Sequence, residues 1–174
     1  MKIHEVMSVK IVKVTPKTPL RDLWKAIFKQ HLHALPVVDT SNKLLGMVAE
    51  EDLLKPLYPN YQQFIEDFVS ASDFEDMEEK MHDIVKLKAE HVMNRTVIFT
   101  RADTPILRAL SRMIVRDVRQ LPVLSDRDEL IGVVSKGDIF DSLFRKHLTG
   151  KILHHRDRHR EGHKSKRFSK ARTY

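Results

Sequence analysis

The strongest constraint on the fold of this chain is an internal repeat. The stretch Leu35-Pro36-Val37-Val38-Asp39, followed by Leu44-Leu45-Gly46-Met47-Val48 and Asp52, returns in matching form 86 residues later. Residues 6–54 align with residues 92–140 without a gap. The identical pairs are Val6/Val92, Met7/Met93, Thr18/Thr104, Pro19/Pro105, Leu35/Leu121, Pro36/Pro122, Val37/Val123, Leu44/Leu130, Gly46/Gly132, Val48/Val134 and Asp52/Asp138. Because chance does not hold so many residue types in one register, the chain carries a duplicated unit.

The same order of elements is predicted in both copies: a strand, a helix, a hairpin of two strands and a second helix. The strands are indicated by β-branched runs, and the helices by Thr-Pro starts and the helical spacing of apolar residues. In the first copy the strands occupy residues 8–14, 36–39 and 44–49, the first helix starts at Thr18-Pro19 and is stopped by Pro36, and the second helix begins over residues 50–54. In the second copy the equivalent elements occupy residues 95–100, 105–119, 122–124, 130–135 and 137–147. One copy is too small to bury both faces of its sheet, so the two should pack together. The expected fold class is α/β (α+β).

The net charge of +7 is divided unevenly along the chain. Residues 145–174 hold 11 Lys and Arg and 2 Asp and Glu, a net charge of +9, whereas residues 1–144 have a net charge of −2. The basic character therefore belongs to a tail, and the composition of residues 149–174 predicts disorder. A nucleic acid partner would have to bind the tail from Lys151 to Tyr174.

Residues 55–90, between the two copies, form a separate acidic element with nine Asp and Glu against four Lys. Pro56 and Pro59 end the preceding helix, and apolar residues then recur at helical spacing. We expect a helical connector that packs on the repeats or, alternatively, contacts another copy or another protein. The expected divisions of the chain are 1–54, 55–90, 91–148 and 149–174.

The composition also excludes several functions. The chain has no cysteine, so it forms neither a disulfide nor a thiolate metal site, and its glycines do not form a phosphate-binding loop of the Rossmann or Walker type. His31 and His33 lie two residues apart on a predicted helix, where side chains diverge, so no metal site is expected. Since no local catalytic motif is present either, we expect no enzyme and no catalytic residues. The chain also lacks an apolar leader and a membrane span, which indicates a soluble cytoplasmic protein.

Taken together, the Thr-Pro helix starts, the Leu-Pro-Val hairpins and the Gly-x-x-(Thr/Ser)-x-x-Asp motif resemble the CBS domain, over about residues 6–54 and 92–143. In that family, two β-α-β-β-α units pack with pseudo-two-fold symmetry, leave clefts that bind adenosine-containing ligands, and commonly form dimers. The resemblance implies a homodimeric, non-catalytic regulatory module. It would require no cofactor, sense an adenosine nucleotide (AMP, ADP or ATP), and signal to a partner protein.

The resemblance also implies where the ligand binds, since the family's aspartate accepts hydrogen bonds from the ribose and its Thr or Ser hydroxyl bonds ribose or phosphate. The second copy keeps the whole motif, with Ser135 and Asp138, whereas the first copy has Ala49 before Asp52 and carboxylates at positions 50 and 51. We therefore expect the main site at Asp138 and a weaker second site at Asp52. Further residues implied for the main site are Val12, Leu32, His33, Ala34 and Arg119.

Two alternatives remain open from the sequence. Asp138 and Ser135 would also suit the start of a helix without any ligand, because a carboxylate and a hydroxyl cap free backbone N–H groups. The repeats could likewise serve as a dimeric scaffold whose basic tail tethers the protein to nucleic acid or another anionic partner.

Overall fold

The computed structural model describes residues 1–57 and 81–148, so the predictions for the middle of the insert and for the tail lie outside the described residues. The first repeat contains α1 (Leu20–Trp24), a π-helical turn (Lys25–Lys29), β1 (Ala34–Val38), β2 (Leu44–Ala49) and α2 (Glu50–Leu54). After α4 (Ala89–Val92), the second contains β3 (Thr100–Arg101), α5 (Ile106–Val115), β4 (Gln120–Leu124), β5 (Leu130–Ser135) and a helix over 136–148. Short 3-10 turns cover Ile3–Glu5 and Lys55–Leu57. None of the helices in these ranges is long and apolar enough to cross a membrane.

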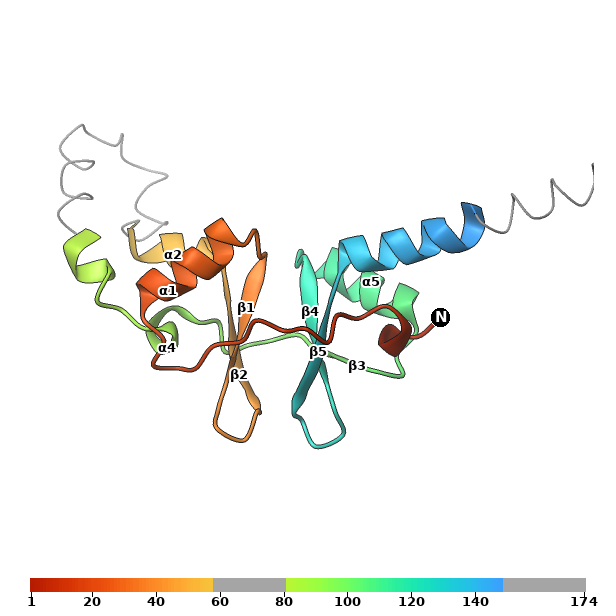
Figure 1. The fold of residues 1–174 in the computed structure, drawn as a ribbon, viewed down its shortest axis with the longest axis horizontal. Coiled ribbons are helices and arrows are strands. Elements are labelled where there is room, and N and C mark those ends of the chain that lie inside the picture. Colours follow the sequence, from red (N-terminus) through yellow and green to blue (C-terminus); the bar gives the residue numbers. More distant parts are fainter. Residues whose placement is uncertain (58–80, 149–174) are drawn as a thin grey trace, which may run out of the picture.

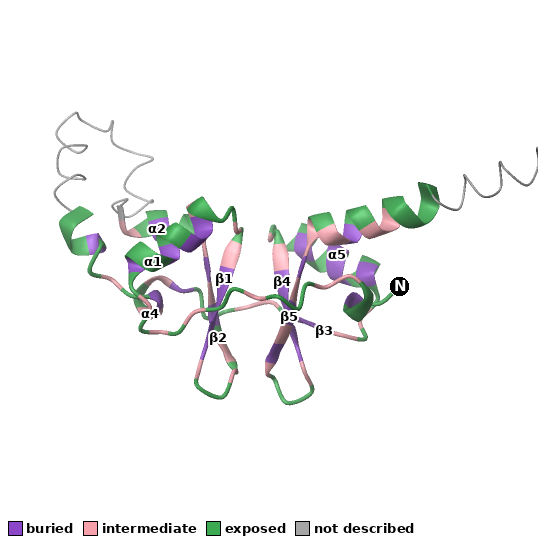
Figure 2. Ribbon diagram, viewed as in Figure 1, coloured by how far each residue is buried: buried purple, intermediate pink, exposed green. Residues whose placement is uncertain are grey.

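The two predicted hairpins are confirmed, and they stand side by side at the centre of the molecule (Figure 1). β1 pairs antiparallel with β2, and β4 with β5, in equivalent registers that place Leu35 opposite Val48 and Leu121 opposite Val134. Those four side chains are fully buried (Figure 2), and they belong to the hydrophobic cores that each hairpin forms with α1 or α5 of its own repeat. The two hairpins also contact each other, through two hydrogen bonds between Asn42 and Leu130 of 2.8 and 3.0 Å.

The strands predicted over 8–14 and 95–100 are too long. In the first, only isolated bridges form, from Ser8 to Val133 and from Val14 to Val37; in the second, only β3 is a strand, parallel to β4. Ser8 pairs with the second repeat and Val14 with the first, so the residues between them run from one repeat to the other without a neighbouring strand. The β-branched residues therefore correctly predicted an extended backbone, but they did not predict which strands it pairs with.

The first helix of each repeat ends earlier than the sequence indicated. α1 and its π-helical turn end at Lys29, and α5 ends at Val115 rather than at residue 119. His31 and Asp117, at equivalent positions, have φ angles of 54° and 49°. Because a residue in the left-handed region cannot continue a right-handed helix, these two residues turn the chain toward β1 and β4.

The hydrophobic cores show that the segment before each repeat packs on the other repeat. Ile3 is fully buried in a cluster with α5, β4 and β5. Ile84 and Ala89 are buried in the cluster of α1, β1 and β2. The N-terminal segment accordingly crosses the molecule to reach the first repeat (Figure 1).

A glycine in each hairpin makes this crossing possible. Ser8 exchanges hydrogen bonds of 2.8 and 3.0 Å with Val133, and a Cβ on the adjacent Gly132 would lie 2.7 Å from Met7 Sδ and 3.2 Å from the Ser8 carbonyl oxygen. In the other repeat, a Cβ on Gly46 would lie 2.8 Å from Met93 Sδ and 3.0 Å from the Asn94 carbonyl oxygen. The methionine and glycine pairs that coincide in the sequence are therefore contact partners across the repeats.

Gly132→Ala is expected to destabilise the fold, because the added methyl group would push Met7 and the Ser8 carbonyl away from β5. Overpacking of this kind costs about 1–3 kcal/mol of unfolding free energy. Chemical denaturation of the wild type and the variant measures the loss. The matched control is Gly137→Ala, where the added Cβ would meet only Ser135 Oγ, at 3.5 Å, and alanine favours the helix.

The same substitution in a Met7→Ala background isolates this contact. With the Met7 side chain shortened, Gly132→Ala should cost less than it does in the wild-type chain. An equal cost in both backgrounds would contradict the packing of Met7 on Gly132.

Candidate functional site

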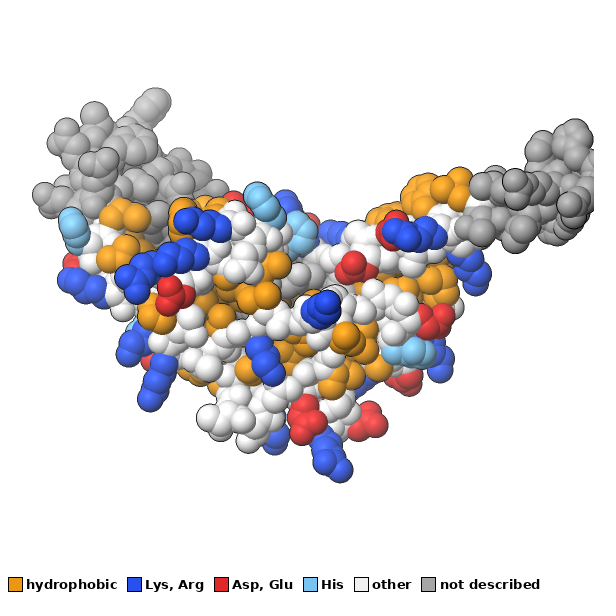
Figure 3. All heavy atoms as spheres, in the orientation of Figure 1, with side chains coloured by type: hydrophobic (Ala, Val, Ile, Leu, Met, Phe, Trp, Pro, Cys, Tyr) orange, Lys and Arg blue, Asp and Glu red, His pale blue; other side chains and the backbone are white. Residues whose placement is uncertain are grey.

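A cleft of about 500 Å³ lies between the two repeats. The first repeat supplies the end of β2 and the start of α2, and the second repeat supplies residues 116–120. Residues 94 and 96–98, between α4 and β3, line the cleft as well. Its lining residues are His33, Ala34, Met47, Ala49, Glu51, Asp52, Asn94, Thr96, Val97, Ile98, Arg116, Asp117, Val118, Arg119, Gln120, Pro122 and Lys136. The space-filling view shows a hollow between the two lobes, with histidine side chains on the rim of the first repeat (Figure 3).

Asp52 is a buried charged residue in this cleft, with 7% of its surface exposed. Its Oδ2 accepts a hydrogen bond of 2.9 Å from the Ala49 N–H, which satisfies a backbone donor at the start of α2. Its Oδ1 lies 2.6 Å from Lys55 Nζ. A ligand hydroxyl that bonds this oxygen must therefore share it with Lys55 or displace the ammonium group.

The second repeat contributes positive charge to the same cleft. Arg116, Arg119 and Lys136 line it, and none of the three forms an ion pair within the described part of the chain. Glu51 and Asp117 also line it, so the cleft combines carboxylates with unpaired cations. Such a site can hold a ligand that carries both hydroxyl groups and a negative charge.

A direct hydrogen bond joins the two repeats at the cleft. Gln120 Nε2 donates to the Ala34 carbonyl oxygen over 2.8 Å. These two residues are equivalent in the repeats, 86 positions apart. The contact fixes the separation of β1 and β4 at their first residues, where the cleft begins.

The structure groups the predicted site residues differently from the sequence. His33, Ala34 and Arg119 line the same cleft as Asp52, whereas Asp138, Ser135, Val12 and Leu32 are not among its lining residues. Val12 is 43% exposed, and Leu32 packs on the core of the first repeat.

The same sequence rule nevertheless finds much of this cleft. Shifting Val12, Leu32, His33 and Ala34 by 86 residues gives a set of four equivalents in the second repeat. All four line the cleft with Asp52: Ile98, Val118, Arg119 and Gln120. Sequence reasoning missed Arg116 and Lys136, because a cation at a predicted helix end has no motif that separates it from a solvated residue.

Ser135 and Asp138 bond each other at the start of the helix 136–148. Asp138 Oδ2 accepts hydrogen bonds of 2.7 Å from both the Ser135 N–H and the Ser135 hydroxyl, and Ser135 Oγ accepts one of 3.1 Å from the Asp138 N–H. This is the capping arrangement that the sequence left open, and it occupies one carboxylate oxygen. Within the described residues, Asp138 Oδ1 has no hydrogen-bond partner.

No group of three or more His, Asp or Glu side chains in residues 1–57 and 81–148 is placed to hold a metal ion.

Ser135→Ala and Ala49→Ser should change stability in opposite directions. Ser135→Ala removes the hydroxyl that bonds the Asp138 N–H, which should lower the unfolding free energy by about 1 kcal/mol. Ala49→Ser supplies the equivalent hydroxyl before Asp52 and should raise it by a smaller amount. Denaturant titrations of both variants test this, and a loss in both would show that the two helix starts are not equivalent.

Comparison with known proteins places these observations in a family. The family model of the CBS domain matches residues 3–58 and 89–145, which together make up more than half of the chain. The protein MJ1426 of Methanocaldococcus jannaschii is 29% identical over 154 residues, covering 82% of this chain and 91% of that protein.

Two solved structures share the fold. CBSX2 of Arabidopsis thaliana, in complex with AMP, is 20% identical with a TM-score of 0.65, over 84% of this chain and 98% of that chain. The CBS domain pair of MJ0100, in complex with 5-methylthioadenosine and S-adenosyl-L-methionine, is 20% identical with a TM-score of 0.60, over 83% of this chain and 99% of that chain.

Proposed function

We propose that this chain, which belongs to the CBS domain family and carries two copies of the domain, is a non-catalytic regulatory module that binds an adenosine-containing ligand. The observation that carries the proposal is the cleft around Asp52, where a buried carboxylate faces a space that also holds unpaired cations. The cytoplasmic location remains a prediction of the sequence.

AMP fits the chemistry of this cleft. The Asp52 carboxylate would accept hydrogen bonds from the ribose hydroxyls, and the apolar side chains of Ile98 and Val118 would contact the adenine ring. Arg119 and Lys136 would bind the phosphate, since cationic donors form short, strong hydrogen bonds with phosphate oxygens. A cleft of about 500 Å³ lies within the range of small-molecule sites.

The bound ligands of the two solved structures support this ligand class. One holds AMP and the other holds 5-methylthioadenosine and S-adenosyl-L-methionine, and all three contain adenosine. The sequence argues against a polyphosphate, because Ala34 and Gln120 stand where many nucleotide-binding members of the family carry an arginine. We therefore favour AMP over ADP and ATP.

Lys55 offers a route from the ligand to a partner protein. It bonds Asp52 Oδ1 and lies in the 3-10 turn that begins the insert. Ribose hydroxyls at Asp52 would compete with this ammonium group, so occupancy of the cleft and the position of Lys55 would be coupled. Such coupling changes a partner's affinity only if the ligand favours one position of Lys55 over the other.

Asp52→Asn is expected to weaken AMP binding at least about tenfold, because it removes the charge that strengthens two hydrogen bonds to the ribose. The substitution keeps an oxygen for the Ala49 N–H, so the fold should persist. Isothermal titration calorimetry of the full chain measures the affinity, and Asp138→Asn is the matched variant in the other repeat. Unchanged binding by Asp138→Asn would place AMP at Asp52.

The reverse pattern would move the site to Asp138, as the sequence motif favours. A thermal-shift panel with AMP, ATP and S-adenosyl-L-methionine provides the second readout, since a ligand at a hundred times its Kd adds about 2.7 kcal/mol of apparent stability. If none of the three binds the wild type, the regulatory proposal is wrong.

We further propose that two copies of the chain associate through the helices of the second repeat. Phe140, Phe144 and Leu148 recur every four residues on the helix 136–148 and are 48%, 63% and 58% exposed. Hydrophobic side chains also lie along the upper edge of this helix in the space-filling view (Figure 3). The neighbouring α5 exposes Leu107, Ile114 and Val115. An apolar face of this kind is typical of an interface, and the family commonly forms dimers.

Phe144→Glu should convert a dimer into a monomer, because a carboxylate would be buried without a partner at the centre of this face. Sedimentation equilibrium of the full chain measures the mass. Lys146→Glu introduces the same side chain two residues away, on the other side of the helix, and should leave the dimer intact. A monomeric wild type, or a dimeric Phe144→Glu variant, would contradict this interface.

The alternative of a scaffold tethered by its basic tail concerns residues 151–174, which lie outside the described residues. No contact in residues 1–57 or 81–148 favours it, and it remains a prediction from the charge of the sequence.

A further inference from the structure

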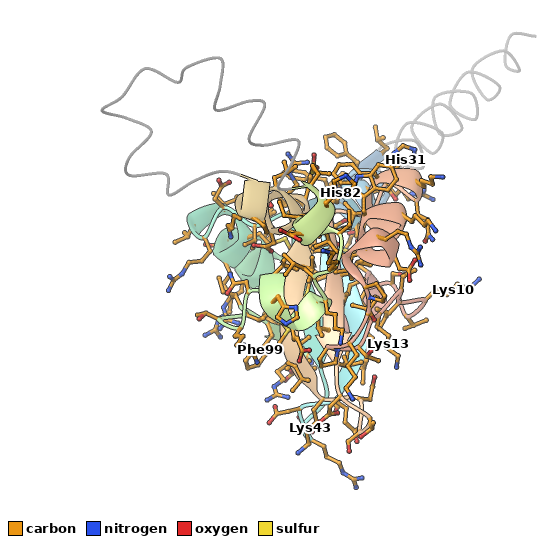
Figure 4. All side chains as sticks on the ribbon, turned by 90° about the vertical axis from the view of Figure 1, so that its left-hand side faces the viewer. Lys10, Lys13, His31, Lys43, His82 and Phe99 are labelled. Atoms are coloured by element: carbon orange, nitrogen blue, oxygen red, sulfur yellow. The ribbon has the colours of Figure 1, made fainter. Side chains whose placement is uncertain are left out.

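A second concave site lies on the outer edge of the second repeat, between β3 and α5. This groove has a volume of about 390 Å³. Three of the eight residues that line it are arginines, Arg101, Arg108 and Arg112, and no acidic residue lines it. Phe99, also in the lining, lies on the edge of the molecule that carries α5, opposite the edge with Lys10 and Lys13 (Figure 4).

The three arginines differ in how far their donors are used. Arg101 is held in place by Asp128, 2.6 Å away, by the Ser125 carbonyl oxygen, and by the ring of Phe99, 5.2 Å from its guanidinium carbon. Arg112 donates one hydrogen bond of 3.3 Å, to the Phe99 carbonyl oxygen. The guanidinium group of Arg108 forms no hydrogen bond or ion pair with any described residue. The groove therefore has one fixed guanidinium group and two that keep most of their donors available.

The fold itself does not require this cluster. The first repeat packs its own helix beside its own hairpin, and its residues equivalent to the three arginines are Thr15, Asp22 and Ala26. Because the duplicated backbone forms there without any arginine, the cluster is a property of the second repeat alone. Arg101 is paired with Asp128, whereas Arg108 and Arg112 are exposed like charges four residues apart, a spacing at which they repel mildly until an anion neutralises them.

The groove is separate from the cleft between the repeats. Val97 and Ile98 line both, so the extended backbone before β3 forms a shared wall. The cations of the cleft, Arg116, Arg119 and Lys136, do not line the groove. The two sites can therefore be tested independently by substitution.

We propose that this groove binds a phosphoryl group of a small phosphorylated molecule, at a site distinct from the proposed adenosine cleft. Guanidinium groups present paired donors that match phosphate oxygens, and Arg101 is oriented in advance by Asp128 and Phe99. The phosphate would lie between Arg108 and Arg112, one helical turn apart on α5, and would neutralise both.

The test uses the full chain, labelled with nitrogen-15, titrated with inorganic pyrophosphate at physiological ionic strength. At that ionic strength charges beyond about 8 Å are screened, which suppresses diffuse binding. The arginine side-chain N–H signals report each site separately, so binding elsewhere on the basic chain does not obscure the result. The Arg108 and Arg112 signals should shift together with one apparent Kd.

Arg108→Gln should raise the Kd read from the Arg112 signal about tenfold, because it removes a charged donor. Arg127→Gln makes the same charge change on an exposed hairpin residue and should leave that Kd unchanged. Asp52→Asn should also leave it unchanged, which separates this proposal from the adenosine site. The proposal is overturned if the two signals do not shift, or if Arg108→Gln leaves the Kd of the Arg112 signal as it was.

Discussion

The fold depends on one kind of contact: the glycine in each hairpin packs closely against a methionine from the segment that precedes the other repeat. Met7 lies against Gly132 and Met93 against Gly46, and each contact continues into backbone hydrogen bonds. Neither hydrophobic core is complete without the segment that crosses to it. The two repeats are therefore interlocked parts of one structure, and we expect them to unfold together.

This interlocking also builds the candidate site. Asn94 exchanges two backbone hydrogen bonds with Met47, which holds the segment between α4 and β3 beside β2. Residues 96–98 of this segment then form a wall of the cleft. The hydrogen bond from Gln120 to Ala34 sets the distance to the other repeat. The cleft is thus a consequence of how the duplicated units exchange their leading segments, and a single repeat could not form it.

The two repeats share the same hairpin pairing but differ in many of their polar residues. Ala49 stands where the second repeat has Ser135, and Lys55 stands where it has Asp141. Lys55 pairs with Asp52, whereas Asp141 pairs with Arg145. The arginines of the groove likewise have no counterpart in the first repeat. Differences of this kind, on an otherwise repeated fold, are where we expect the two halves to have acquired different ligands.

The sequence predicted what depends on local pattern and missed what depends on distant partners. The hairpins follow from Leu-Pro-Val and the turns between strands, and the helix starts follow from Thr-Pro. The same reasoning extended the strand over 8–14, because its β-branched residues do not reveal that Ser8 pairs with the second repeat. The repeat alignment also showed that the methionines and the glycines occupy equivalent positions, but it did not predict that they touch. The contact of Met7 with Gly132 joins residues more than a hundred positions apart in the chain.

A crystal structure of the full chain grown with AMP would show directly where the nucleotide binds. We expect the ribose hydroxyls on the Asp52 carboxylate, Lys55 displaced and the phosphate near Arg119. AMP bound away from the cleft between the interlocked repeats would contradict the proposed site.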